Sequence, residues 1–163
     1  MSKQIDASTG RKRSAARLAA VQALYQLGQI ATDTPSEVIE QFKQHRFVTL
    51  GEEAPAVEPD AEFFTALVAG AAQRRAEIEP MIGEALAQGW TIERIEKVVR
   101  AILLAGVFEL LARQDVPAKV AINEYVEIAH AFYADSEPGF VNSVLDRLAR
   151  RLRPQEFGGN SGA

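Results

Sequence analysis

The chain has 163 residues, of which 47% are hydrophobic, and its net charge is −4. This length and composition are typical of a single globular domain that buries about two-thirds of the surface of its unfolded chain. Cysteine is absent, which excludes disulfide bonds and thiolate metal sites. Residues 1–6 contain no apolar run that could act as a signal peptide, so we expect a cytoplasmic protein.

A first helix is predicted by residues that fall on one face at helical spacing. These are Leu18, Val21, Leu24, Tyr25 and Gly28. Arg17 falls within the same stripe, so either the helix projects past the core there or Arg17 is paired with an acidic neighbour. We expect residues 1–10 to form a flexible arm ahead of this helix.

A second helix is predicted to open at Thr34 and Pro35, with Thr34 as its cap, and to end near Arg46. Two prolines and three glutamates in residues 48–60 predict a loop after it.

Two regions in the middle of the chain are predicted to be helical. The first runs from about Asp60 to Gln88, and its small side chains at residues 69–72 permit a close neighbour or a bend. The second, residues 98–111, is apolar almost all round, which predicts a central helix packed on several sides. It is shorter than the roughly 20 residues that a membrane-spanning helix needs.

Two further helices follow, because Pro117 and Pro138 each stand near a helix start, where a missing N–H has no cost. The last helix has apolar residues on one face, at Val141, Val144, Leu145, Leu148 and Leu152. No segment alternates convincingly enough for a strand, so the predicted fold class is all-α, with one helical domain over residues 11–153. We expect residues 154–163 to be a disordered tail.

Basic residues gather near both ends of the chain. Residues 1–32 carry a net charge of +4, residues 147–163 carry +3, and the residues between them carry −11. This pattern predicts a basic patch on an acidic body, provided that the fold brings the two ends together. The plainer interpretation is that the basic clusters are only solubilising and that late arginines favour the helix dipole.

The search for catalytic chemistry finds no phosphate-binding glycine loop and no nucleophile elbow. Glu124, Glu127 and His130 stand at successive i+3 positions, and the last two form the Glu-x-x-His pair of di-iron bundles. Such a bundle needs a second pair, but Phe42 stands where a glutamate should precede His45. A solvated polar face is the simpler interpretation, so we expect no metal and no other cofactor.

Two aromatic residues, Tyr25 and Phe140, also bear on function. Single-stranded RNA is often bound by stacking its bases on aromatic rings while basic residues hold its phosphates. Phe140 opens the last helix, whose inward stripe is complete without it, so we expect its ring to face RNA. For Tyr25 a core position is equally open, because aromatic residues on an apolar stripe are usually packed.

Several segments between Arg11 and Arg153 resemble, in consistent order, the NusB family of bacterial transcription antitermination factors. They are Ala20 to Tyr25, Phe64 to Gly70, Trp90, Arg100 to Leu103, Glu109 to Leu111, Pro117 to Glu127, and Phe140 to Asp146. The resemblance implies about seven helices in two packed subbundles. It also implies a protein without enzymatic activity that binds the boxA element of nascent ribosomal RNA transcripts together with NusE, a small-subunit ribosomal protein. The complex then acts on RNA polymerase with other Nus factors.

The resemblance further implies which residues make the site. For RNA these are Arg11, Lys12, Arg13, Arg17, Tyr25 and Phe140, and for the protein partner they are Glu96, Asp135 and Ser136. Many family members have a basic residue just before the Phe-Val-Asn motif, where this chain has Gly139. We therefore expect one phosphate contact to be weaker or absent.

Two other functions stay open at this point. The same helical module occurs as the N-terminal RNA-binding domain of ribosomal RNA cytosine methyltransferases, although this chain has neither a methyltransferase domain nor a cysteine nucleophile. A metal-dependent bundle enzyme would rest on Glu124, Glu127 and His130. The sequence also leaves open whether the free protein is a monomer or a homodimer.

Overall fold

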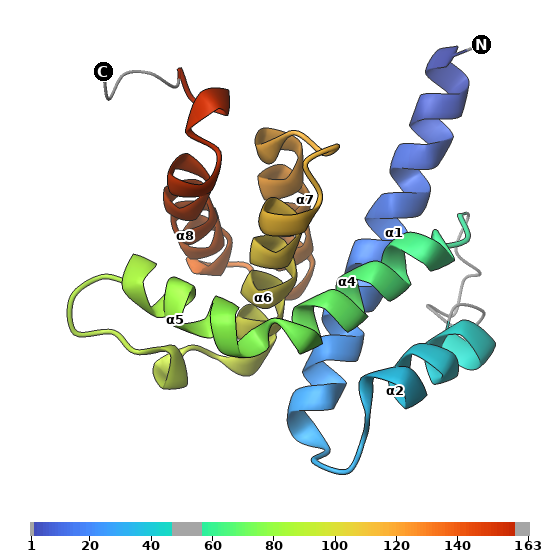
Figure 1. Ribbon diagram of the computed structural model, residues 1–163, viewed down its shortest axis with the longest axis horizontal. Helices are drawn as coiled ribbons and strands as arrows, with labels where there is room; N and C mark the ends of the chain where they lie inside the picture. Colours follow the sequence, from blue (N-terminus) through green and yellow to red (C-terminus); the bar gives the residue numbers. More distant parts are fainter. Residues whose placement is uncertain (1, 47–56, 159–163) are drawn as a thin grey trace. The chain divides into compact units, whose positions relative to one another are not determined.

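The computed structural model describes residues 2–46 and 57–158. Within these ranges the chain forms seven α-helices and no β-strand, which confirms the predicted all-α class (Figure 1). The chain divides into two compact units, Met1–Ala72 and Gln73–Ala163, which correspond to the two expected subbundles. None of the helices described is both long and apolar enough to cross a membrane.

The first unit is built from two longer helices and two short ones. They are α1 (Ser2–Gln29), α2 (Pro35–Gln41), the π-helical turn η1 (Phe42–Arg46) and α4 (Ala61–Gln73), whose last residue crosses the unit boundary. Because α1 begins at Ser2, the residues that we expected to form a flexible arm are helical in the structure. Thr34 caps α2 as predicted, since its Oγ1 accepts a hydrogen bond from the N–H of Glu37 at 3.2 Å. The predicted loop lies mostly outside the described residues.

The start of α4 is fixed both locally and to α1. The N–H of Asp60 donates to the carbonyl oxygen of Lys12 at 3.0 Å, and Asp60 Oδ1 caps α4 by accepting from the N–H of Phe63 at 3.0 Å. The rings of Phe42 and Phe64 stack with their centroids 5.6 Å apart. These contacts set the position of Phe63 beside α1, where its ring contacts basic residues of that helix.

The second unit contains the remaining helices. They are α5 (Arg75–Ala85), η2 (Ile92–Arg94), α6 (Lys97–Ala112), α7 (Ala118–Phe132), α8 (Glu137–Leu152) and η3 (Pro154–Glu156). Helices α6, α7 and α8 pack on one another, and α5 packs on α6 and α8. Every residue from Ala101 to Leu110 is buried, as predicted for a helix that is packed on several sides. A Cβ at Gly106 would lie 3.1 Å from the methyl groups of Leu145, so this glycine permits the close approach of α8 to α6.

Arg153 joins the end of α8 to the connection between α6 and α7. Its guanidinium is fully buried and donates to the carbonyl oxygens of Glu109, Leu110, Arg113 and Val116 and to the carboxylate of Glu156. A buried charge is tolerated only when its donors are satisfied in this way. The N–H of Ala118 donates to Glu156 Oε1 at 2.8 Å. That bond first, and the bond from Arg153 second, lower the pKa of Glu156.

Several boundaries differ from those predicted. The long helical region after Asp60 is broken at Arg74, where φ is −99° and ψ is 13°, just beyond the small residues at which we expected a bend. Its second part ends at Ala85, and Gly89 lies in the following turn with a φ of +92°. The start of the predicted tail forms η3, while residues 159–163 lie outside the described residues.

Candidate nucleic-acid interface

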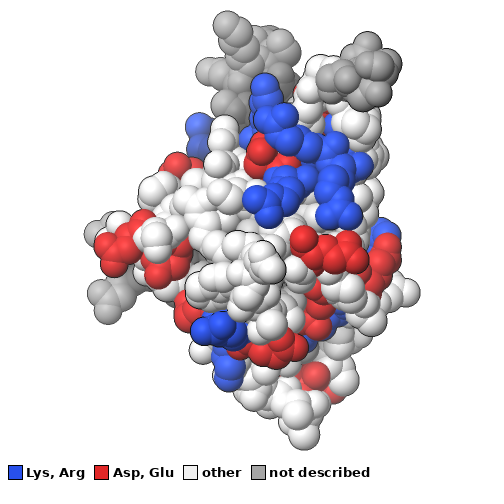
Figure 2. All heavy atoms as spheres, turned by 90° about the vertical axis from the view of Figure 1, so that its left-hand side faces the viewer, with Lys and Arg blue, Asp and Glu red and all other residues white. Residues whose placement is uncertain are grey.

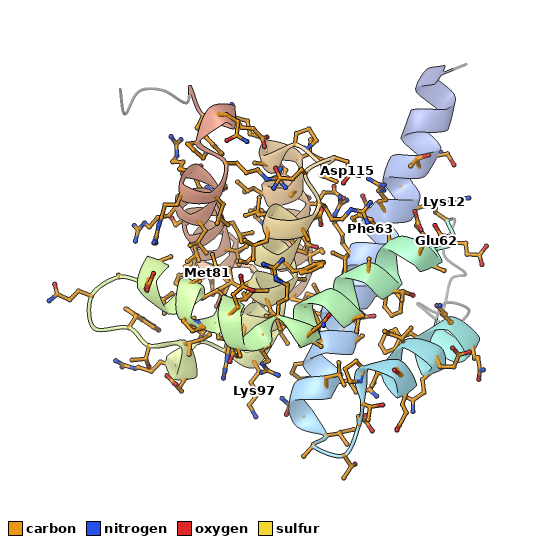
Figure 3. All side chains as sticks on the ribbon, viewed as in Figure 1. Lys12, Glu62, Phe63, Met81, Lys97 and Asp115 are labelled. Carbon is orange, nitrogen blue, oxygen red and sulfur yellow. The ribbon has the colours of Figure 1, made fainter. Side chains whose placement is uncertain are left out.

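The basic residues of α1 become less exposed along the helix. Arg11 and Lys12 are exposed, Arg13 is half-buried, and Arg17 is only 3% exposed. The guanidinium carbons of Arg13 and Arg17 lie 4.6 Å and 5.0 Å from the centroid of the Phe63 ring. Figure 3 labels Phe63, which belongs to α4. Stacking on an aromatic face is a favourable place for a cation. This contact gives Arg17 a favourable neighbour within the apolar stripe.

Tyr25 lies further along α1 with 39% of its surface exposed. An aromatic ring with this exposure is open to a ligand, so the prediction that it faces RNA keeps its geometric basis. Of the residues predicted from α1, three are thus open at the surface, namely Arg11, Lys12 and Tyr25.

Phe140 lies at a hollow in the second unit. The hollow has a volume of about 270 Å³ and is lined by Trp90, Arg94, Ile95, Glu96, Val99, Ser136, Glu137 and Phe140. The ring centroids of Phe140 and Trp90 are 6.4 Å apart, and the rings are tilted by 44°. Trp90 is 50% exposed, and the guanidinium of Arg94 lies 5.4 Å from its ring centroid. The hollow therefore offers two aromatic rings and a cation to a flat ligand.

Two of the three residues predicted for the protein partner line this same hollow. Glu96 caps α6 by accepting a hydrogen bond from the N–H of Val98 at 3.4 Å, and it is exposed. Ser136 precedes α8, and its carbonyl oxygen accepts from the N–H of Phe140 at 3.0 Å. Asp135 is exposed just before it. The structure thus brings Phe140 together with the predicted partner residues, whereas the predicted residues of α1 belong to the other unit.

Gly139 stands beside Phe140 at an exposed position of α8. A Cβ there would meet no atom within 4 Å, so the structure has room for the basic side chain that many family members carry at this position.

The arginines of α8 and the residue after it, Arg153, separate into two groups. Arg147, Arg150 and Arg151 are exposed, whereas Arg153 is buried and belongs to the core contacts described above. Figure 2 shows Lys and Arg side chains clustered on the side of the molecule where α5 and α8 lie in Figure 1. Counting all four arginines as surface charge was therefore wrong for Arg153.

Glu124, Glu127 and His130 do not form a metal site in the structure. Within the described residues, no group of three or more histidine, aspartate or glutamate side chains could hold a metal ion. Glu127 and His130 are exposed on α7 and Glu124 is half-buried, while Ala121, Tyr125 and Ile128 face the core. Phe132, the last residue of α7, is 44% exposed, and its ring centroid lies 6.4 Å from that of Tyr133.

Comparison with known proteins gives the family. A model of the NusB family matches residues 14–150. The chain belongs to the NusB family. It is 51% identical over 147 residues to the transcription antitermination protein NusB of Maricaulis maris, which covers 90% of this chain and 91% of that protein. It is 47% identical over 150 residues to NusB of Rhizobium rhizogenes, with the same coverage of both chains.

Solved NusB structures share the fold. NusB of T. maritima aligns with a TM-score of 0.72 and 25% identity, covering 90% of this chain and 96% of that one. A chain in the crystal structure of antitermination factors NusB and NusE in complex with dsRNA aligns with a TM-score of 0.68 and 24% identity, covering 86% and 98%. The NusB fold is thus common to proteins of quite different sequence.

Sequence reasoning did not assign a role to Trp90 or Arg94, although both line the hollow. In the sequence, Trp90 contributes only to the family resemblance. The available signal was a large aromatic residue in a polar connection after Gly89, where no core stripe requires one.

Proposed function

We propose that the protein is a transcription antitermination factor that acts by binding RNA and a protein partner and catalyses no reaction. The observation that carries this proposal is the match to curated antitermination proteins over 90% of the chain. The proposed RNA is the boxA element of nascent ribosomal RNA transcripts, and the proposed partner is the ribosomal protein NusE.

RNA binding is divided between phosphate contacts and base contacts. Arg11 and Lys12 are exposed cations that can hold phosphates, which positions RNA without reading its sequence. The rings of Phe140 and Trp90 can hold an unstacked base, with Arg94 at the edge of the hollow. In this proposal Tyr25 adds a further stacking surface on α1. Arg13 and Arg17 support that helix through Phe63 and contribute less directly.

The partner site adjoins the base site. Glu96 and Ser136 line the hollow that contains Phe140, and Asp135 is exposed beside it. A partner bound to these residues would cover one side of the hollow, exclude water from it and add its own contacts to the same base. RNA and NusE would then strengthen each other's binding, and the coupling free energy must be equal in both directions.

In the proposed function, the complex with RNA and NusE then interacts with RNA polymerase and other Nus factors. Light scattering with and without NusE would show whether the free protein is a monomer or a homodimer.

The decisive experiment titrates a labelled boxA RNA with the purified protein, with and without NusE, over a series of salt concentrations. The expected result is binding that NusE strengthens and that salt weakens. A scrambled RNA of the same length is the control for sequence preference. Absence of binding in both conditions would overturn the proposed function.

A further inference from the structure

Three side chains of helix α8 point in nearly the same direction and lead away from the hollow. Arg147 follows Phe140 by about two helical turns and Arg151 follows it by about three, each within about 20° of the same direction. The line would extend roughly 16 Å along the helix. We name Phe140, Arg147 and Arg151 the α8 strip.

The first cation of the strip keeps most of its hydrogen-bonding capacity. Arg147 is exposed, and its Nη1 donates to the carbonyl oxygen of Ala85 at 2.7 Å. A guanidinium has five N–H donors, and this bond uses one of them. Because the acceptor is a neutral backbone group, it orients Arg147 over α5 without neutralising its charge.

The second cation is held only loosely. Arg151 Nη2 lies 3.4 Å from a carboxylate oxygen of Glu84, and the two side chains are 54% and 66% exposed. An ion pair that is so open to water contributes little, so an incoming phosphate can replace Glu84. Arg150 differs from both strip residues, because it is bound to Asp146 at 2.9 Å and its guanidinium covers the ring of Phe157. It also points about 80° away from Phe140 around the helix.

We propose that the α8 strip guides single-stranded RNA, with one base at Phe140 and the phosphates of the adjoining nucleotides on Arg147 and Arg151. The proposal rests on the proposed function and adds the path of the strand on the second unit. Proteins that bind single strands combine aromatic rings for the bases with cations that follow the backbone, and the α8 strip has both. The basic cluster on this side of the molecule agrees with the charge that such a strand requires (Figure 2).

The test compares a double variant, Arg147→Gln with Arg151→Gln, with the unchanged protein on a boxA RNA extended by several nucleotides at both ends. Each phosphate contact to a single strand contributes about 0.7 to the slope of log affinity against log salt, so this slope should fall by about 1.4. The affinity should fall about tenfold at low salt. A control variant, Lys119→Gln with Arg150→Gln, removes the same number of charges at exposed positions outside the strip and should keep the original slope.

A variant in the opposite direction strengthens the test. Glu84→Gln removes the carboxylate that competes for Arg151, and it should raise affinity severalfold only when Arg151 is present. Unfolding curves of all the variants identify any change that arises from lost stability.

The strand can also be located directly. The chain has no cysteine, so Ser143→Cys creates a single attachment point for a photocrosslinker on the exposed face between Phe140 and Arg147. The bound RNA should crosslink there at a nucleotide next to the stacked base, but not to Asn123→Cys on α7. Unchanged slopes, or an absence of crosslinks from Ser143→Cys, would overturn the strip while RNA binding itself persists. If the unchanged protein binds no RNA, the strip and the proposed function both fail.

Discussion

The basic residues of α1 and those of α8 look alike in sequence but are used differently in the two units. Each region has exposed cations and one buried arginine, which is Arg17 within α1 and Arg153 directly after α8. Arg17 lies against the ring of Phe63, whereas Arg153 is surrounded by backbone carbonyl groups and Glu156. The comparison teaches that a run of basic residues is not yet a basic surface, because tertiary partners decide which cations can reach a ligand.

The largest expected effect comes from removing the buried cation of the second unit. Arg153→Ala should lower the free energy of unfolding by about 3–5 kcal/mol, because Glu156 and several buried carbonyl groups lose their donor. Arg153→Lys should recover only part of this loss, since an ammonium group lacks the planar fork of the guanidinium. Urea unfolding measures both, with exposed Arg150→Ala as the control, expected to change stability by about 0.5 kcal/mol or less. A loss below about 1 kcal/mol for Arg153→Ala would contradict a structural role.

The next effect separates binding from folding at the hollow. Phe140→Ala should weaken boxA binding roughly 5- to 150-fold with little change in melting temperature, since stacking of a base is worth about 1–3 kcal/mol. Trp90→Ala is the companion variant and should weaken binding similarly. If Phe140→Ala instead lowers stability by about 3–5 kcal/mol while the folded fraction still binds RNA, Phe140 belongs to the core.

On α1 the exposed and the buried cations can be changed separately, to test whether the exposed ones bind RNA and the buried one stabilises the fold. Arg11→Ala with Lys12→Ala should lower the salt slope by about 1.4 for every RNA sequence and leave stability unchanged. Arg17→Ala should leave the slope unchanged and reduce stability by about 2 kcal/mol, because it removes a buried cation from the Phe63 ring. The opposite pattern would assign Arg17 to the RNA surface and the exposed pair to solubility.

A smaller effect concerns pH. The pKa of Glu156 lies below its ordinary value of 4.5, chiefly through the bond from the N–H of Ala118. A carboxyl group whose pKa is lower in the folded state stabilises the fold above its unfolded pKa, and this contribution is lost as the pH falls through the folded pKa. As the pH falls below about 4.5, the unfolding free energy of the original protein should therefore decrease more than that of Glu156→Gln. The extra decrease should be less than about 1 kcal/mol in total. Parallel curves of stability against pH would contradict this.

The smallest expected effect is a gain of function at Gly139. Because a side chain at this position meets no neighbour, Gly139→Arg should fold normally, raise RNA affinity a few-fold and increase the salt slope by about 0.7. Gly139→Ala controls for the change in helix propensity. Equal affinities for the two variants would show that no phosphate passes this position.

The helices could be predicted because their signals are local. The cap at Thr34 and the all-round apolar surface of residues 101–110 depend on spacing along the chain, and both predictions are confirmed. The family could also be predicted, because several segments carried the resemblance together.

The parts that escaped prediction depend on contacts between distant segments. Nothing near Arg17 in sequence announces the ring of Phe63, and nothing near Arg153 announces the carbonyl groups at the end of α6. The hollow requires that the connection after α5 return to the start of α8, so Trp90 and Phe140 meet only in the folded unit.

Trp90 is the only tryptophan in the chain, and it lies at the hollow beside Phe140. The protein therefore carries an intrinsic fluorophore at the position where the proposed base and the proposed partner would meet. A base stacked on the indole should quench its emission, whereas a partner that only shields it from water should shift the emission to shorter wavelength. Arrival of RNA and arrival of NusE would then give different optical signals, and the order of assembly could be followed in a stopped-flow instrument without attaching any dye.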